Sequence, residues 1–153
     1  MNARPSASDL PRGFTFAATP CELKGRSGLD LALFVGDVPI VAAAMFTTNC
    51  VQAAPVIASQ AHMQESHSKM RAVIANSGNA NCCTGADGTA AAAAISLKVA
   101  HELGRLHPSQ VLVCSTGVIG VLLHVEKTFM LSHNLFVHAA PARAPSRKSR
   151  AQL

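Results

Sequence analysis

A strand–helix–strand pattern in the second half of the chain constrains the fold more than any other feature. Residues 71–75 (RAVIA) and residues 111–114 (VLVC) are short apolar runs, which is typical of buried strands. Between them, residues 88–103 contain five consecutive alanines and then an apolar residue at every fourth position from Ile95 onward, which predicts an amphipathic helix. Two strands joined by a helix indicate an α/β fold of the layered α+β kind, with helices against a sheet.

The ends of this expected helix carry their own signals. Asp87 and Thr89 are candidate N-terminal caps, because their side-chain oxygens can accept a hydrogen bond from a free backbone N–H. Gly104 stands where a left-handed C-terminal cap is expected. Pro108 then prevents the helix from continuing.

The first half of the chain predicts further strands. Residues 29–35 and residues 40–47 are both apolar, and the Asp37-Val38-Pro39 sequence between them predicts a hairpin. Residues 55–58 predict a third, shorter strand. Residues 60–69 are polar and predict a linker or a short surface helix.

Charge divides the chain into three regions. Residues 1–12 are polar and contain prolines, which predicts a flexible arm, and residues 13–127 are long enough for one domain. Residues 128–153 form a divergent basic tail with four lysines and arginines and no acidic residue, and we expect it to be disordered. The net positive charge therefore belongs to the tail. A tail-dependent nucleic-acid binder is consequently a lesser alternative, since the rest lacks a basic patch interleaved with aromatic residues.

The cysteines and histidines do not have the spacing of a metal site. The five cysteines are odd in number and form no C-x-x-C pair, which argues against a disulfide framework or a zinc site: Cys21, Cys50, Cys82, Cys83 and Cys114. Free thiols in a reducing compartment are the better interpretation. The longest apolar run, residues 38–46, is about half of the ~20 residues that span a bilayer. We therefore expect a cytoplasmic protein without a membrane segment.

Two polar segments are candidates for chemistry. Thr116 and Gly117 follow the strand expected at residues 111–114, and a hydroxyl beside a backbone N–H can donate two hydrogen bonds to the oxyanion of an acyl transfer. The alternative is a structural turn in which the Thr116 hydroxyl bonds locally.

The second segment follows the strand expected at residues 71–75. Its side chains are suited to shaping a polar pocket: Asn76, Ser77, Gly78, Asn79 and Asn81. These residue types are also ordinary in turns, so a purely structural role is the alternative.

Taken in order, six segments resemble the N-terminal part of the ornithine acetyltransferases, the bifunctional glutamate N-acetyltransferases of arginine biosynthesis. The resemblance covers about residues 11–120, which is most of this chain and roughly the first third of a family member. The segments are residues 11–14 (PRGF), 30–33 (DLAL), 45–56 (MFTTN leading to AAPV), 76–81 (NSGNAN), 83–85 (CTG) and 115–120 (STGVIG).

The resemblance implies a definite fold and reaction. It implies part of the family's layered sandwich, made from a precursor that cleaves itself before a threonine into α and β chains. The N-terminal threonine of the β chain is the nucleophile, and its α-amino group can serve as the base. The acetyl group passes from N-acetylornithine to glutamate without a metal or bound coenzyme, although acetyl-CoA is a donor substrate in bifunctional members. The family's oxyanion donors correspond to Thr116 and Gly117.

The chain also departs from the family. It has no counterpart of the cleavage segment, and the surroundings of Thr128, which is the only threonine after Thr116, do not match it. We therefore expect an α-chain-like portion of a truncated or frame-altered copy, with the oxyanion residues but no nucleophile, and inactive alone. The alternative is a partner subunit that needs a separate β-like chain.

Overall fold

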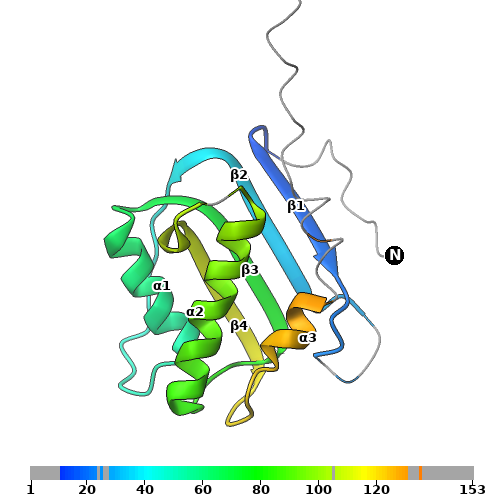
Figure 1. Cartoon of the computed structure of the whole chain (residues 1–153). Coiled ribbons are helices and arrows are strands. Elements are labelled where there is room, and N and C mark those ends of the chain that lie inside the picture. Colours follow the sequence, from blue (N-terminus) through cyan, green and yellow to red (C-terminus); the bar gives the residue numbers. More distant parts are fainter. Residues whose placement is uncertain (1–10, 24, 26–27, 105, 131–134, 136–153) are drawn as a thin grey trace, which may run out of the picture.

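The computed structural model describes residues 11–23, 25, 28–104, 106–130 and 135 (Figure 1). The four strands form one sheet in the order β1-β2-β3-β4. They are β1 (Phe14–Thr19), β2 (Leu31–Val41), β3 (Lys69–Asn79) and β4 (Val111–Val118). The helices are α1 (Ala54–Glu65), α2 (Gly85–Glu102), the short 3-10 helix η2 (Pro108–Gln110) and α3 (Val125–Met130).

The sheet is mixed and has its helices on one side. Neighbouring strands from β1 to β3 are antiparallel, whereas β3 and β4 are parallel because α2 crosses between them. All three α-helices lie against the same face of the sheet (Figure 1). The layered α/β class expected from the sequence is confirmed.

The core lies between this face and the helices. Alternate residues of the strands point toward the helices, and α2 contributes the residues that repeat every four positions. The main buried apolar side chains are Leu31, Leu33, Val35, Ala72, Ile74, Ile95, Val99, Val111 and Val113. Small and branched side chains dominate, which allows the helices to approach the sheet closely.

Helix α2 confirms the strongest expectation, but its start differs. It begins at Gly85, three residues earlier than expected, and its N-cap is Thr84, without a side-chain capping bond. Asp87 and Thr89 are therefore inside the helix, and the expectation that they cap it was wrong. Gly104 does adopt a left-handed conformation (φ 97°) just after the helix, and the Leu106 N–H donates to Ala100 O at 2.9 Å.

The expected hairpin at residues 37–39 is wrong. Strand β2 continues through these residues to Val41, and the irregularity is a shift in its pairing with β3 between Val35 and Ile40. A bulge accommodates Pro39, which has no N–H to donate. Residues 42–47, expected to extend a second strand, have no regular structure.

The expected strand at residues 55–58 is also wrong, because these residues form the start of α1. Pro55 is in the first turn, where its missing N–H costs no helical hydrogen bond. Helix α1 then includes most of the segment expected as a linker or short helix. Strand β1 was not expected at all.

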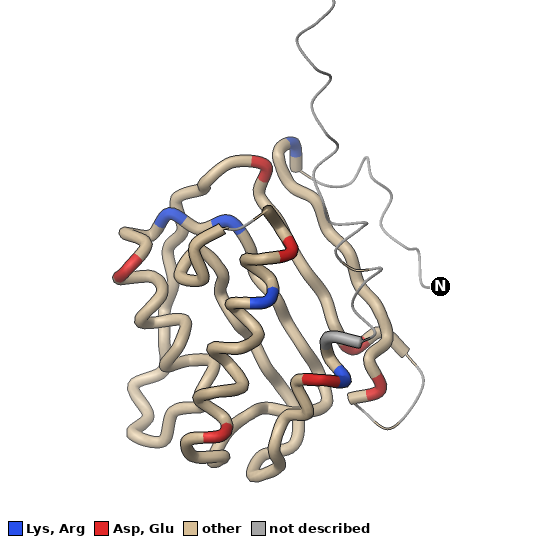
Figure 2. The backbone as a smooth tube through the Cα atoms, in the orientation of Figure 1, with Lys and Arg blue, Asp and Glu red and all other residues tan. Residues whose placement is uncertain are grey.

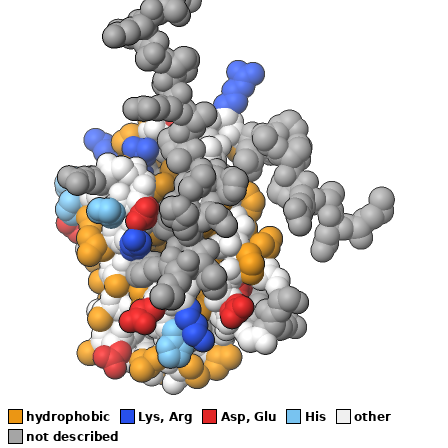
Figure 3. Space-filling view, turned by 45° about the vertical axis from the view of Figure 1, so that its right-hand side comes forward, with side chains coloured by type: hydrophobic (Ala, Val, Ile, Leu, Met, Phe, Trp, Pro, Cys, Tyr) orange, Lys and Arg blue, Asp and Glu red, His pale blue; other side chains and the backbone are white. Residues whose placement is uncertain are grey.

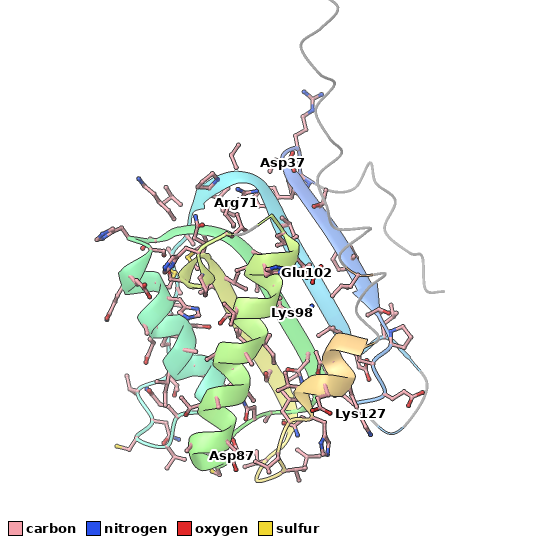
Figure 4. The ribbon with its side chains drawn as sticks, in the orientation of Figure 1. Asp37, Arg71, Asp87, Lys98, Glu102 and Lys127 are labelled. Carbon is pink, nitrogen blue, oxygen red and sulfur yellow. The ribbon has the colours of Figure 1, made fainter. Side chains whose placement is uncertain are left out.

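The described residues contain no helix long and apolar enough to cross a membrane. Most of the expected arm, and all but a few residues of the basic tail, lie outside the described residues. In the described part, lysines and arginines occur at several separate places among acidic residues (Figures 2 and 3). Lys98 and Glu102, for example, form an ion pair of 2.7 Å on α2 (Figure 4).

Candidate functional site

The two segments singled out in the sequence lie side by side at the ends of β3 and β4. In the parallel register, Asn76 pairs with Ser115, Ser77 with Thr116, and Gly78 with Gly117. Residues 76–79 and 116–117 are still in strand conformation, where a loop and a turn were expected, and Asn81 lies beyond the end of β3. Because parallel strands end at the same edge, segments almost forty positions apart in the sequence lie next to each other.

Alternation along the strands decides which side chains face outward. Met70, Ala72 and Ile74 of β3 are buried against the helices, so Ser77 points to the opposite face. By the same alternation, Thr116 of β4 points to that opposite face and is exposed. Ser115 points toward the helices, and its buried hydroxyl oxygen has no hydrogen-bond partner among the described residues.

Gly117 is required by its contact with β3. Its φ is 139°, a conformation that other residues rarely adopt. A Cβ atom at this position would lie 2.2 Å from the Gly78 carbonyl carbon and 2.5 Å from the Asn79 nitrogen. The two backbones therefore approach this closely only because Gly117 has no side chain.

A shallow cavity of about 230 Å³ lies beside this pair. Thr116, Ser77, Asn76 and Asp30 are among the residues that line it, and Gly117 is not. Its other lining residues are apolar and include Leu29, Ala32 and Ala75. Gly78, Asn79 and Asn81 do not line it. Of the five residues expected to shape a pocket, two therefore reach this cavity.

The asparagines hold the backbone around the site. Asn76 Nδ2 donates to Asn79 O at 2.8 Å, and Asn79 Nδ2 donates to Val121 O at 3.0 Å. Asn79 Oδ1 accepts from the Asn81 N–H at 2.7 Å, while Asn81 Nδ2 donates to Gly88 O at 2.8 Å. These bonds tie the end of β3 to the segment after β4 and to α2.

Asp30 supports the site, a role that its place in the sequence does not indicate. Its carboxylate is buried and accepts hydrogen bonds from the Cys21 and Leu23 N–H groups, the latter at 2.7 Å. Its carbonyl oxygen accepts from the Ser77 N–H at 2.8 Å. One residue thus fixes the loop after β1 and the strand that carries Ser77.

Cys21 lies fully buried beside this carboxylate. Burial, and to a lesser extent the negative charge of Asp30, raises the pKa of the Cys21 thiol to about 11. The thiol is therefore protonated at neutral pH, and it is not a reactive nucleophile.

The described residues also form cavities away from this pair of strands. A cavity of about 550 Å³ lies between α2 and residues 122–127, away from Thr116. Within the described ranges, no group of three His, Cys, Asp or Glu side chains is placed to hold a metal ion.

The sheet surface that carries Thr116 is apolar, and we call it the open face. It has one row of residues paired across all four strands (Phe16, Phe34, Val73 and Leu112) and a second row of Ala18, Ala32, Ala75 and Cys114. The Phe16 and Phe34 rings are 4.9 Å apart, and Phe34 is 45% exposed. No described helix or strand covers this face (Figure 1).

Comparison with known proteins relates these observations to two solved structures. The arginine biosynthesis bifunctional protein ArgJ of Bacillus halodurans superposes with a TM-score of 0.72 at 36% identity, over 76% of this chain and 59% of that chain. The ornithine acetyltransferase of Mycobacterium tuberculosis, solved in complex with ornithine, gives a TM-score of 0.71 at 39% identity, over 85% of this chain and 65% of that chain.

Sequence comparison agrees. The arginine biosynthesis bifunctional protein ArgJ of Thermotoga neapolitana is 46% identical over 118 residues, which cover 77% of this chain and 29% of the relative. That of Chlorobaculum tepidum is 49% identical over 117 residues, or 76% and 28%. The chain therefore spans less than a third of the length of these curated relatives. The ArgJ family model matches residues 15–148, and the chain belongs to the ArgJ family.

Proposed function

We propose that this chain provides the charge-stabilising part of a glutamate N-acetyltransferase of arginine biosynthesis. In this proposal, the Thr116 hydroxyl and the Gly117 N–H donate hydrogen bonds to the oxyanion that forms when an acetyl group passes from N-acetylornithine to glutamate. Two fixed donors aimed at that oxygen stabilise it without reorganisation during the reaction. The observation that carries the proposal is the exposed Thr116–Gly117 pair at the end of β4, of which Thr116 lines a cavity together with Ser77.

The attacking threonine is assigned to a β-like chain. A hydroxyl is a weak nucleophile, and an N-terminal threonine carries its own base in the α-amino group. The open face supports a partner at this position. Covering this apolar sheet surface with another chain would remove it from water, which is favourable.

The proposal requires no metal ion or bound coenzyme, and acetyl-CoA enters only as a donor substrate in a bifunctional reaction. It also assigns the protein to the cytoplasm, which is consistent with free cysteines at all five positions. The region boundaries stay a proposal as well: an arm at residues 1–12, the acetyltransferase-like region at residues 13–127 and a divergent tail at residues 128–153.

Reconstitution with a β-like chain tests the proposal. The full chain is mixed with the separately produced part of the Thermotoga neapolitana relative that begins at its catalytic threonine, and N-acetylglutamate is measured after addition of N-acetylornithine and glutamate. We expect no product above the uncatalysed rate from this chain alone, and product from the mixture.

Variants make the test specific to the oxyanion donors. Thr116→Ala is expected to reduce the rate of the mixture by roughly 10²–10³-fold, as loss of one oxyanion donor does in other enzymes. Thr89→Ala, at an exposed position of α2, is the matched control and should leave the rate unchanged. Equal rates for the two variants would contradict the assigned role, and product from the chain alone would contradict the assignment of the nucleophile.

A further inference from the structure

Two adjacent cysteines outside the candidate site form a dithiol. Cys82 and Cys83 are both free, and their Sγ atoms are 3.8 Å apart. Cys83 is exposed and Cys82 is half-buried, so both thiols can be reached from solvent. The sequence indicates no chemical role for either thiol.

The backbone under the two thiols is held in place. The Cys82 carbonyl oxygen accepts a hydrogen bond from the Gly120 N–H at 2.8 Å. The preceding residue, Asn81, is fully buried, and its Oδ1 accepts from the Thr84 hydroxyl at 2.8 Å. Cys83 itself has a positive φ of 57°. The flanking residues therefore fix the turn, and little conformational freedom is lost when a ligand joins the two sulfur atoms.

The sulfur spacing fits a bridging atom better than a disulfide. An S–S bond is only about 2.05 Å long, so the two sulfurs would have to move much closer on a restrained turn. One atom that bonds both sulfurs at about 2.3 Å, the length of a zinc–thiolate bond, holds them more than about 3 Å apart, so they would have to move much less than for a disulfide. A structural zinc ion, however, needs four ligands. The described residues provide no group of three suitable side chains. The ligand that fits is therefore one whose central atom needs only two sulfur atoms from the protein.

The surroundings indicate the rest of that ligand. Cys83 lines a cavity of about 480 Å³ together with the apolar side chains of Val51, Ala54 and Ile57. A ligand that presents an apolar organic group beside its thiol-binding atom could bury that group here. Cys50 lines the same cavity and is the one rival thiol that the experiment must separate.

We propose that Cys82 and Cys83 form a binding site for trivalent organoarsenicals, compounds in which one arsenic atom carries an organic group and accepts two thiolates. For an arsenoxide, two As–S bonds form and the As=O bond breaks. The two thiol protons leave with the oxygen as one water molecule. Arsenic stays trivalent, so no oxidant or reductant takes part.

The protonation of the pair suits this condensation. Partial burial, together with the hydrogen bond to Cys83, raises the pKa of the Cys82 thiol above its ordinary value. Cys82 is therefore protonated at neutral pH. A divalent cation would have to displace that proton into solvent, whereas an arsenoxide carries it away in water.

Phenylarsine oxide is the probe. Intact-mass measurement of the full chain should give one phenylarsenic group per molecule, which a small dithiol removes and an equal concentration of a monothiol does not. Cys82→Ser and Cys83→Ser should each weaken binding by roughly 10²-fold, because the second As–S bond no longer forms at a high effective concentration. Cys50→Ser and Cys114→Ser are the matched controls and should bind as the unchanged chain does, and circular dichroism checks that each variant is folded.

Each other outcome overturns the proposal. Loss of binding in Cys50→Ser with retention in Cys82→Ser would assign the ligand to Cys50 and Cys83. Retention in both Cys82→Ser and Cys83→Ser, or removal of the adduct by the monothiol, would show attachment through single thiols only.

Discussion

Substitution of Gly117 should disturb the packing of β3 against β4 at the site directly. Gly117→Ala combines an unfavourable backbone conformation with a Cβ atom 2.2 Å from the Gly78 carbonyl carbon, so β3 and β4 must separate locally. We expect the free energy of unfolding to fall by at least about 2 kcal/mol in denaturant titrations.

Gly104→Ala is the control for this substitution. Gly104 also has a positive φ, but a Cβ atom there would meet nothing within 4 Å. Gly104→Ala should therefore lower the free energy of unfolding only through its unfavourable backbone conformation, by about 1–2 kcal/mol. If both variants lose the same stability, the close approach to Gly78 does not constrain Gly117.

Cys21 should make stability depend on pH above neutrality. Its pKa rises from 9.0 to about 11 in the fold, so the folded protein binds this proton more tightly than the unfolded chain does. The contribution is therefore complete below about pH 9 and is lost as the pH rises toward 11, at a cost of at most about 3 kcal/mol. Thermal melts across this range should show a decrease in Tm that is smaller in Cys21→Ala. An equal decrease in both proteins would assign the effect to other groups.

At this scale the sequence was informative about Thr116 and Gly117 and not about the residues that support them. A hydroxyl beside a glycine after an apolar run is visible in the chain itself. The role of Asp30 depends on Cys21, Leu23 and Ser77, which only the fold brings to it. The asparagine hydrogen bonds likewise reach partners from other elements, so their structural role could not be separated from a role in a pocket.

Among the elements, α2 depends on its buried stripe. Ile95 is 3% exposed and contacts the core, whereas Leu97 on the same helix is 60% exposed. Ile95→Ala should lower the free energy of unfolding by about 2–5 kcal/mol, because it removes buried apolar surface and leaves a cavity. Leu97→Ala should change it by less than about 0.5 kcal/mol. Denaturant titrations of the two variants that gave similar values would mean that α2 does not dock through this stripe.

The elements differ in how well local sequence determined them. Helix α2 has high alanine content and a clear period, and both favour the same structure. The apolar residues at the start of α1 are too few to show a period, so the local sequence predicts a strand there, although Pro55 also suits a first helical turn. The irregularity in β2 resembles a hairpin in the sequence, because a proline between two apolar runs is common to both.

For the whole molecule, the open face should control association. Its apolar rows are unprotected by any described helix, so we expect the isolated chain to bind a hydrophobic dye or to self-associate. Phe34→Asp should reduce both in dye-binding and sedimentation measurements, and lower the free energy of unfolding by no more than about 1–2 kcal/mol, mainly from the lost contact with Phe16. Leu97→Asp, on the exposed side of α2, is the control. Equal dye binding and equal self-association of the two variants would argue that association does not occur through the open face.

The arrangement around Asp30 also links the beginning of the chain to the candidate site. The buried carboxylate accepts hydrogen bonds from backbone amides of the loop that follows β1, and the same residue anchors Ser77 through its main chain. A deletion or fusion that removes this loop would leave the buried Asp30 carboxylate without these donors. Asp30 is far from Thr116 in the sequence, but it contacts Ser77, which pairs with Thr116. The integrity of the site therefore depends on the loop at residues 20–23 as well as on Thr116 and Gly117 themselves.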